Sequence, residues 1–212
     1  KIGVSGIIGG VGLGIAMISF IYSITNTSAA ITLLCLAAMP FFTALLGFLF
    51  LRERISVNVW IAIILATVGI IIIALGNTGK ASLLGFVFGM TSSIGFSIFS
   101  VTLRWRKETP KFTTVAVSGL FCFVIASIFI LSKDQLFFST SYNGTLFSLH
   151  GVLVCFGLIL YSIGSRAIPA AELTLLSLTE VIGGIFWVWL PIFGINEVPS
   201  TNTITVSYTH LT

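Results

Sequence analysis

The residue best placed for chemistry is Glu180, the one charged residue near the middle of a long apolar run. Placing a charged carboxylate at that depth in a bilayer costs about 2.5 kcal/mol or more, so we expect it to face a cavity or a partner, or to be protonated. It could then bind a cationic or amine substrate or carry a coupling proton. The alternative is a structural role, in which a protonated carboxyl group hydrogen-bonds to a neighbouring helix.

Two other residues share the helical face of Glu180. Ser177 lies three positions before it and Trp187 seven positions after it, which places all three on one side of a helix. If Glu180 lines a substrate pathway, we expect Ser177 and Trp187 to line it too. Trp187 could equally be a lipid-facing or interfacial aromatic residue.

Tyr22 and Asn26 are a second pair on one helical face, at the end of the first apolar run. Their hydroxyl and amide groups could bind a polar substrate near the outer mouth of a pathway. The plainer interpretation is an interfacial tyrosine and a helix-end asparagine, because tyrosine is enriched where a span meets the membrane surface.

The sequence lacks the residue patterns that other kinds of chemistry require. No glycine-rich loop ends in Lys-Ser or Lys-Thr, so no ATP-binding loop is predicted. Cys35, Cys122 and Cys155 lie in apolar runs without CxxC or Cys/His spacing, so we expect neither a metal site nor a disulfide framework. An intramembrane enzyme would need paired acids, a Ser/His pair or a metal cluster. We therefore expect no enzymatic activity and no cofactor.

The composition is that of a polytopic membrane protein. Of its 212 residues, 57% are hydrophobic and only 8% are charged, whereas about a quarter of the residues in a soluble domain are charged. The net charge of +4 comes from Lys and Arg in short loops, where these residues set orientation in the membrane. The expected partner is the lipid bilayer, and no nucleic-acid binding is implied.

Seven apolar runs are long enough to cross about 30 Å of hydrocarbon as helices. They cover residues 4–24, 29–51, 57–75, 83–103, 114–131, 145–164 and 173–193. Pro40, inside the second run, removes one backbone hydrogen bond and should kink that helix. Eight of the ten Lys and Arg residues fall on one side of this path. The positive-inside rule makes that side cytoplasmic, and we expect a multi-pass protein of the inner or plasma membrane.

The sequence contains a weak internal duplication. Residues 27–56 are repeated, much altered, over residues 168–200, with Glu53 aligned to Glu197 after a slip of three residues. The copies are five helices apart, and because five is odd they have opposite orientations. We therefore expect an all-α bundle of inverted five-helix units, with seven of ten helices present in this chain.

Several motifs occur here in a specific order: residues 22–28 (YSITNTS), the Pro40 helix, the charged exit 52–54, residues 168–172 (IPAAE) and residues 197–200 (EVPS). Together they resemble the two repeats of EamA-type permeases of the drug/metabolite transporter superfamily. The resemblance implies a secondary transporter that moves small metabolites, amino acids or drugs, often outward, by alternating access. Protons are a candidate coupling ion and a homodimer a candidate assembly.

The resemblance also divides the chain and adds two site residues. Residues 1–76 would be the last three helices of the first repeat, and residues 81–204 the second repeat without its last helix. We expect residues 205–212 to be a non-native tail. Phe96 and Phe99 lie where the family places aromatics that face the central cavity, although with 19 phenylalanines ordinary packing is the plainer interpretation. The alternative function is a non-transporting membrane receptor or assembly protein with a packed interior.

Overall fold

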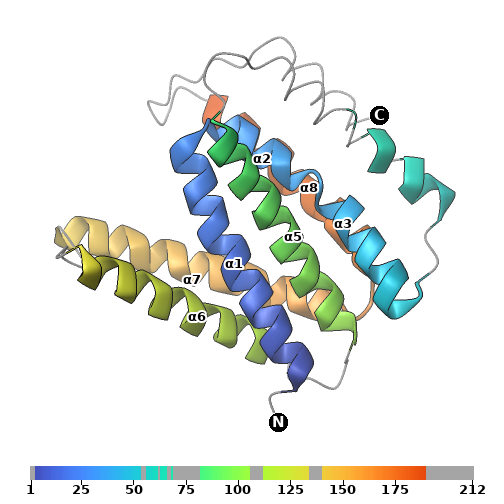
Figure 1. Ribbon diagram of the computed structural model, residues 1–212, viewed down its shortest axis with the longest axis horizontal. Helices are drawn as coiled ribbons and strands as arrows, with labels where there is room; N and C mark the ends of the chain where they lie inside the picture. The colour runs from blue at the N-terminus through green and yellow to red at the C-terminus, as the bar shows by residue number, and fades with distance from the viewer. Residues whose placement is uncertain are drawn as a thin grey trace.

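The computed structural model describes residues 3–53, 56–61, 63–65, 68, 82–105, 112–133 and 140–189. Within these ranges every regular element is helical. Eight helices have complete bounds: α1 (Val4–Asn26), α2 (Ala29–Leu36), α3 (Met39–Leu46), the π-helix η1 (Gly47–Leu51), α5 (Leu83–Trp105), α6 (Thr113–Ser132), α7 (Ser141–Gly164) and α8 (Ala170–Trp189). Residues 57–61 and 63–65 are helical as well. Figure 1 shows α1 and α5 side by side at the centre of the bundle.

Five of the described segments are long and apolar enough to cross a membrane. They are Val4–Asn26, Ile31–Leu51, Leu83–Trp105, Thr113–Ser132 and Ser141–Gly164. Each of them coincides with one of the seven predicted runs. The predicted runs 57–75 and 173–193 extend outside the described residues, and α8 covers the second of these as far as Trp189. The described part of the chain is thus all-helical, and the chain is a multi-pass membrane protein.

The second span is divided at Ala37 and Ala38, between α2 and α3. Pro40 lies in the first turn of α3, where its missing N–H would have no partner within the helix in any case. Ser28 caps the start of α2, because its hydroxyl accepts a hydrogen bond from the backbone N–H of Ile31 at 3.3 Å. The helix of this span is therefore interrupted where its sequence supplies two alanines shortly before a proline.

Serine hydroxyl groups of helix α5 donate hydrogen bonds to the divided span. Ser93 donates to the carbonyl oxygen of Cys35, and Ser97 donates to the carbonyl oxygen of Met39 at 3.1 Å. The carbonyl oxygen of Cys35 also accepts the backbone N–H of Ala38 at 3.1 Å, so the serine supplies an additional bond. The hydroxyl groups themselves need partners at membrane depth, and these two bonds attach α5 to both sides of the break between α2 and α3.

Helices α1 and α5 approach each other through glycine. A Cβ atom added to Gly95 would lie 2.6 Å from the carbonyl oxygen of Gly12, so the two backbones are in direct contact. Next to this contact, Ser92 of α5 donates a hydrogen bond of 2.8 Å to the carbonyl oxygen of Ala16. Small residues allow such close packing between helices in lipid, where apolar burial from water no longer drives association.

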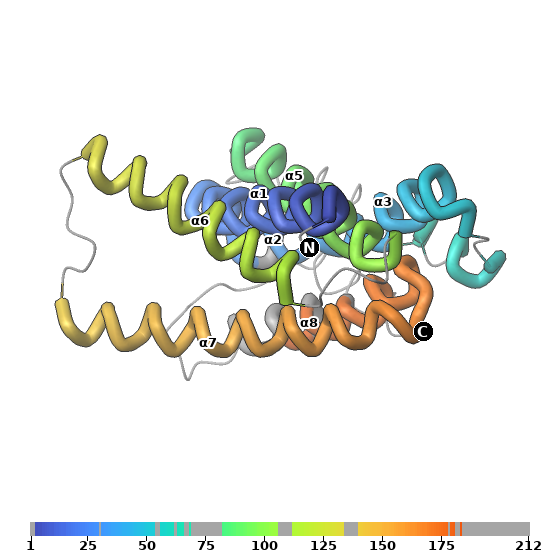
Figure 2. The backbone as a smooth tube through the Cα atoms, turned by 90° about the horizontal axis from the view of Figure 1, so that it is seen from below, coloured from blue at the N-terminus to red at the C-terminus, as the bar shows by residue number. Residues whose placement is uncertain are grey.

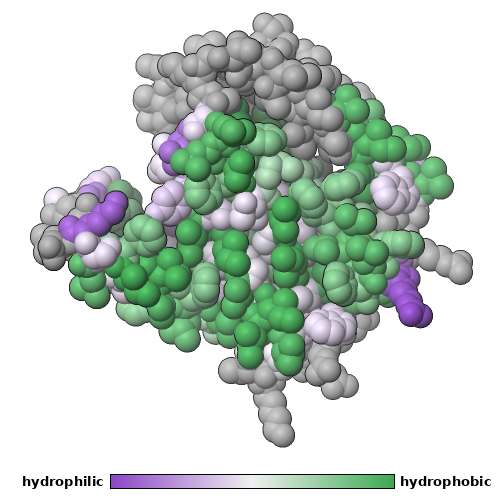
Figure 3. Space-filling view, viewed as in Figure 1, coloured by the Kyte–Doolittle hydropathy of each residue, from purple (hydrophilic) through white to green (hydrophobic). Residues whose placement is uncertain are grey.

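Helices α6 and α7 lie toward one side of this centre. Figure 2 shows them diverging toward the end at which α6 finishes and α7 begins. Both expose large apolar side chains, among them Leu120, Phe123, Val152, Leu153 and Phe156. Figure 3 shows hydrophobic residues over much of one face of the molecule. Such a surface suits contact with lipid or with further helices, and it would be unfavourable in water.

We predict that Gly95→Ala lowers the stability of the protein by about 1–3 kcal/mol, the usual effect of overpacking a tight contact. The added methyl group would meet backbone atoms of α1, which cannot move aside as a flexible side chain can. Thermal unfolding in detergent measures the effect. Gly119→Ala on α6 is the matched control, because a Cβ atom there meets nothing within 4 Å. Equal melting temperatures for both variants would contradict the contact.

Candidate functional site

A cavity of about 640 Å³ lies between α1, α6 and α7. Its volume falls within the range of about 300–1,000 Å³ that is typical of small-molecule sites. Most of its lining is apolar, and the polar groups are few. The lining residues are Met17, Ile18, Ile21, Tyr22, Val115, Ser118, Gly119, Cys122, Ile125, Ala126, Phe129, Ile130, Lys133, His150, Gly151, Val154, Cys155 and Leu158.

Tyr22 is the predicted site residue that lines this cavity directly. Its ring stacks on Phe88 with 5.2 Å between the ring centres, and a tilted contact of 6.3 Å joins it to Phe129. Asn26 is absent from the lining, and its side-chain nitrogen donates to the carbonyl oxygen of Tyr22 at 2.7 Å. Of this predicted pair, Tyr22 alone therefore contributes to the cavity wall.

Phe96 and Phe99 form an aromatic cluster with Tyr161 of α7. Ring centres are 5.5 Å apart between Phe96 and Phe99, and Tyr161 lies 5.2 Å from Phe96 and 5.8 Å from Phe99. The hydroxyl groups of Tyr161 and Ser100 share a hydrogen bond of 2.9 Å. The cluster packs around Val115 and Leu158, which also line the cavity. The two phenylalanines thus lie behind the cavity wall and do not line it.

Sequence reasoning missed Tyr161. The tyrosine lies near the end of an apolar run, and its partner Ser100 is 61 positions away in the sequence. A hydroxyl group on an otherwise apolar run was the available signal, because a buried tyrosine normally hydrogen-bonds.

Two of the α8 candidates, Glu180 and Ser177, are absent from the lining of the cavity. Glu180 is exposed and has no hydrogen bond or ion pair with the described residues. Ser177 donates to the carbonyl oxygen of Thr174 at 2.8 Å, within its own helix. The side chain of Trp187 lies outside the described residues. The structure therefore does not bring Glu180 or Ser177 together with Tyr22, and the pathway role of all three α8 residues stays a prediction.

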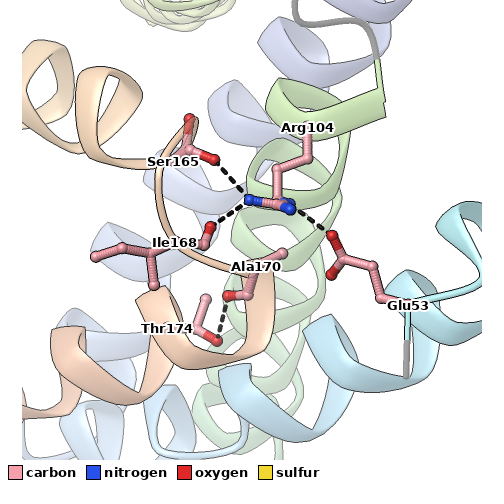
Figure 4. Close-up of polar contacts among 6 residues, drawn as sticks. All are labelled: Glu53, Arg104, Ser165, Ile168, Ala170 and Thr174. Atoms are coloured by element: carbon pink, nitrogen blue, oxygen red, sulfur yellow. Dashed lines mark hydrogen bonds and ion pairs between the residues drawn. The ribbon is translucent and has the colours of Figure 1, made fainter. Parts of the chain in front are cut away.

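A second polar centre joins three segments at one end of the bundle. Arg104, at the end of α5, forms an ion pair of 2.6 Å with Glu53. Its guanidinium group also donates to the carbonyl oxygens of Ser165, at 3.2 Å, and of Ile168. Figure 4 shows Arg104 between the segment that carries Glu53 and the turn that precedes α8. We call this arrangement the Arg104 junction.

Local backbone geometry brings Glu53 to Arg104. The π-helix η1 ends at Leu51, and the next residue, Arg52, has a φ of 54° in the left-handed region. The N–H of Glu53 then donates back to the carbonyl oxygen of Gly47 at 3.3 Å. This turn reverses the chain and directs the carboxylate toward α5. The side chains of Arg104 and Glu53 are only 15% and 22% exposed, which strengthens the pair relative to one in open solvent.

We predict that Glu53→Gln lowers stability by about 1.5–3 kcal/mol, the range for a hydrogen bond to a charged group. The glutamine would leave the guanidinium group without its counterion. Thermal unfolding of the purified protein measures the loss. Arg52→Gln is the matched control, since Arg52 is exposed and has no ion pair among the described residues. A Glu53→Gln variant as stable as the control would show that the junction contributes little.

Comparison with known proteins places this geometry in context. Residues 1–75 match the EamA-like transporter family. The chain is 30% identical over 95 residues to an uncharacterized transporter of Helicobacter pylori (strain J99 / ATCC 700824), which is 45% of this chain and 32% of that protein. It is also 38% identical over 77 residues to the DNA translocase SpoIIIE of Bacillus subtilis (strain 168), which is 36% of this chain and 10% of that protein.

Both curated relatives are much longer than the matched regions. The chain covers 32% of the transporter and 10% of the DNA translocase, so each printed name describes a whole protein of which only a part is compared. The family match and the transporter agree with the membrane-spanning helices described above. Residues 1–75 therefore form a domain of the EamA-like transporter family, in the drug/metabolite transporter superfamily, within a multi-pass membrane protein.

Proposed function

We propose that the protein is a secondary transporter that exports small metabolites, amino acids or drugs across the cell membrane by alternating access. The observation that carries this proposal is the cavity of about 640 Å³ between membrane-spanning helices in a chain with an EamA-like transporter domain. A mainly apolar cavity with a few polar groups is the usual form of a small-molecule site. Transport across a bilayer requires that such a cavity open to each side in turn.

The positions of the helix starts support an inverted repeat. The duplication in the sequence aligns Ala29 with Ala170, and these residues are the first of α2 and of α8. The preceding helices, α1 and α7, have 23 and 24 residues. Repeats of opposite orientation enclose the substrate site of many secondary transporters, and rocking of one repeat against the other gives alternating access.

In this proposal Tyr22 contributes a hydroxyl group to the substrate site, and the cluster of Phe96, Phe99 and Tyr161 supports the cavity wall. Glu180 is the candidate proton carrier or amine-binding group. Its exposure on α8 is compatible with contact to a pathway or to a further helix. Ser177 and Trp187 would extend the same face of α8.

We predict that Gly151→Phe lowers the transport rate about tenfold or more, because the new ring fills a cavity sized for a small molecule. Gly151 lines the cavity, and a Cβ atom there meets nothing within 4 Å, so the fold should tolerate the change. Gly157→Phe is the matched control on the same helix. It also has open space around its Cβ atom but lies outside the lining.

The measurement is efflux from cells that express the protein, over a panel of amino acids, dipeptides and cationic drugs. Equal transport by the two phenylalanine variants would show that the cavity is not the pathway. No flux of any compound from well-expressed wild-type protein would contradict export and favour a non-transporting receptor or assembly protein.

We also predict that Glu180→Gln abolishes transport that depends on a proton gradient, because glutamine cannot bind and release the proton. Glu180→Asp keeps a carboxyl group and should retain part of the activity. Uptake and efflux in vesicles with an imposed pH gradient separate the two variants. Full activity of Glu180→Gln would assign the glutamate a structural role.

A further inference from the structure

A small hollow lies beside the Arg104 junction, where η1 and the following residues meet the start of α8. Its volume is about 20 Å³, enough for a single water molecule or ion. Oxygen-bearing side chains contribute much of its wall. The lining residues are Thr43, Ala44, Gly47, Glu53, Ser56, Val59, Pro169, Ala171 and Glu172.

Thr43 supplies a buried hydroxyl group without a partner. The residue is 0% exposed, and its side-chain oxygen makes no hydrogen bond. A threonine within a helix often donates to the carbonyl oxygen four residues earlier. Here that residue is Met39, whose carbonyl oxygen accepts the hydroxyl of Ser97 at 3.1 Å. A buried hydroxyl left unsatisfied is unfavourable, which points to a ligand in the hollow.

The carboxylate of Glu53 faces both the junction and the hollow. One of its oxygens, Oε1, pairs with Arg104. The other, Oε2, would lie 3.5 Å from a Cβ atom added to Gly47, and Gly47 lines the hollow. One oxygen of the carboxylate therefore remains available on the side of the hollow.

The charges around the hollow do not balance. Glu53 and Glu172 each bring one negative charge, and Arg104 brings one positive charge to Glu53. Glu172, in the first turn of α8, is exposed and forms no ion pair with the described residues. Its carboxylate, like the second oxygen of Glu53, therefore adds negative charge at the rim of the hollow, near the hydroxyl groups of Thr43 and Ser56. Ligands that are all oxygen suit hard cations.

We propose that this hollow binds one small monovalent cation, Na⁺ in the test below. A single positive charge balances Glu172, and the cation satisfies Thr43 while it bridges the segment after η1 to the start of α8. Broken helices and unwound turns commonly coordinate such ions in secondary transporters. The suggestion that the ion couples to substrate movement rests on the proposed transport function, whereas binding itself does not.

The test is thermal unfolding of the purified protein in NaCl, KCl or choline chloride at constant ionic strength. Because a ligand that binds the folded state stabilises it, Na⁺ should raise the melting temperature in a saturable manner. K⁺ should have a smaller effect because the hollow is small, and choline should have none.

Gly47→Ala is the most specific variant. Its methyl group would make an ordinary contact with Glu53 Oε2 and occupy part of the hollow without changing any charge. We expect the Na⁺-dependent shift to disappear in this variant, and also in Thr43→Val and Glu172→Gln. Gly119→Ala, in open space on α6, should keep the full shift.

Two results would overturn the proposal. If Na⁺ and choline give the same melting temperature for the wild-type protein, the hollow holds water alone. If Gly47→Ala and Thr43→Val keep the Na⁺ shift, the cation binds elsewhere. A protein that shows the shift but transports nothing would retain the cation site and refute the transport function, so the two failures can be told apart.

Discussion

This bundle depends on hydrogen bonds between its helices at membrane depth, such as the bond from Ser93 to the carbonyl oxygen of Cys35. A membrane offers no water to polar groups, so a hydroxyl group at membrane depth needs a partner within the protein. The serine hydroxyl groups of α5 donate to carbonyl oxygens of α2, α3 and α1. One helix with closely spaced serines thereby fixes the positions of three others.

The same helix also organises the end of the bundle. Arg104 follows the serines on α5, and its guanidinium group binds both Glu53 and the turn before α8. Because a guanidinium group has five donors in a fixed plane, it can hold several acceptors together. Residues of both predicted repeats meet there. Side chains of α5 thus connect the interior of the bundle with a junction at its end.

The sequence predicted the helices well because apolar length is a local property. The runs 4–24, 83–103 and 114–131 correspond closely to α1, α5 and α6. Long-range geometry was not predictable in this way. Nothing near Glu53 in the sequence indicates a pairing with Arg104, 51 positions away, and nothing near Tyr22 indicates that α6 and α7 complete its cavity. Glu180 was conspicuous in the sequence because a lone charge in an apolar run stands out, whereas its surroundings depend on tertiary structure.

The backbone contact between Gly12 and Gly95 limits how the bundle can move. With no side chain between them, α1 and α5 cannot turn about their own axes without collision, and the neighbouring Ser92 bond resists sliding. We therefore expect the two helices to move together as one rigid body. Among the described residues, the helices are interrupted at Ala37 and Ala38 and at the turn before α8, so we expect a change of shape to occur at these places.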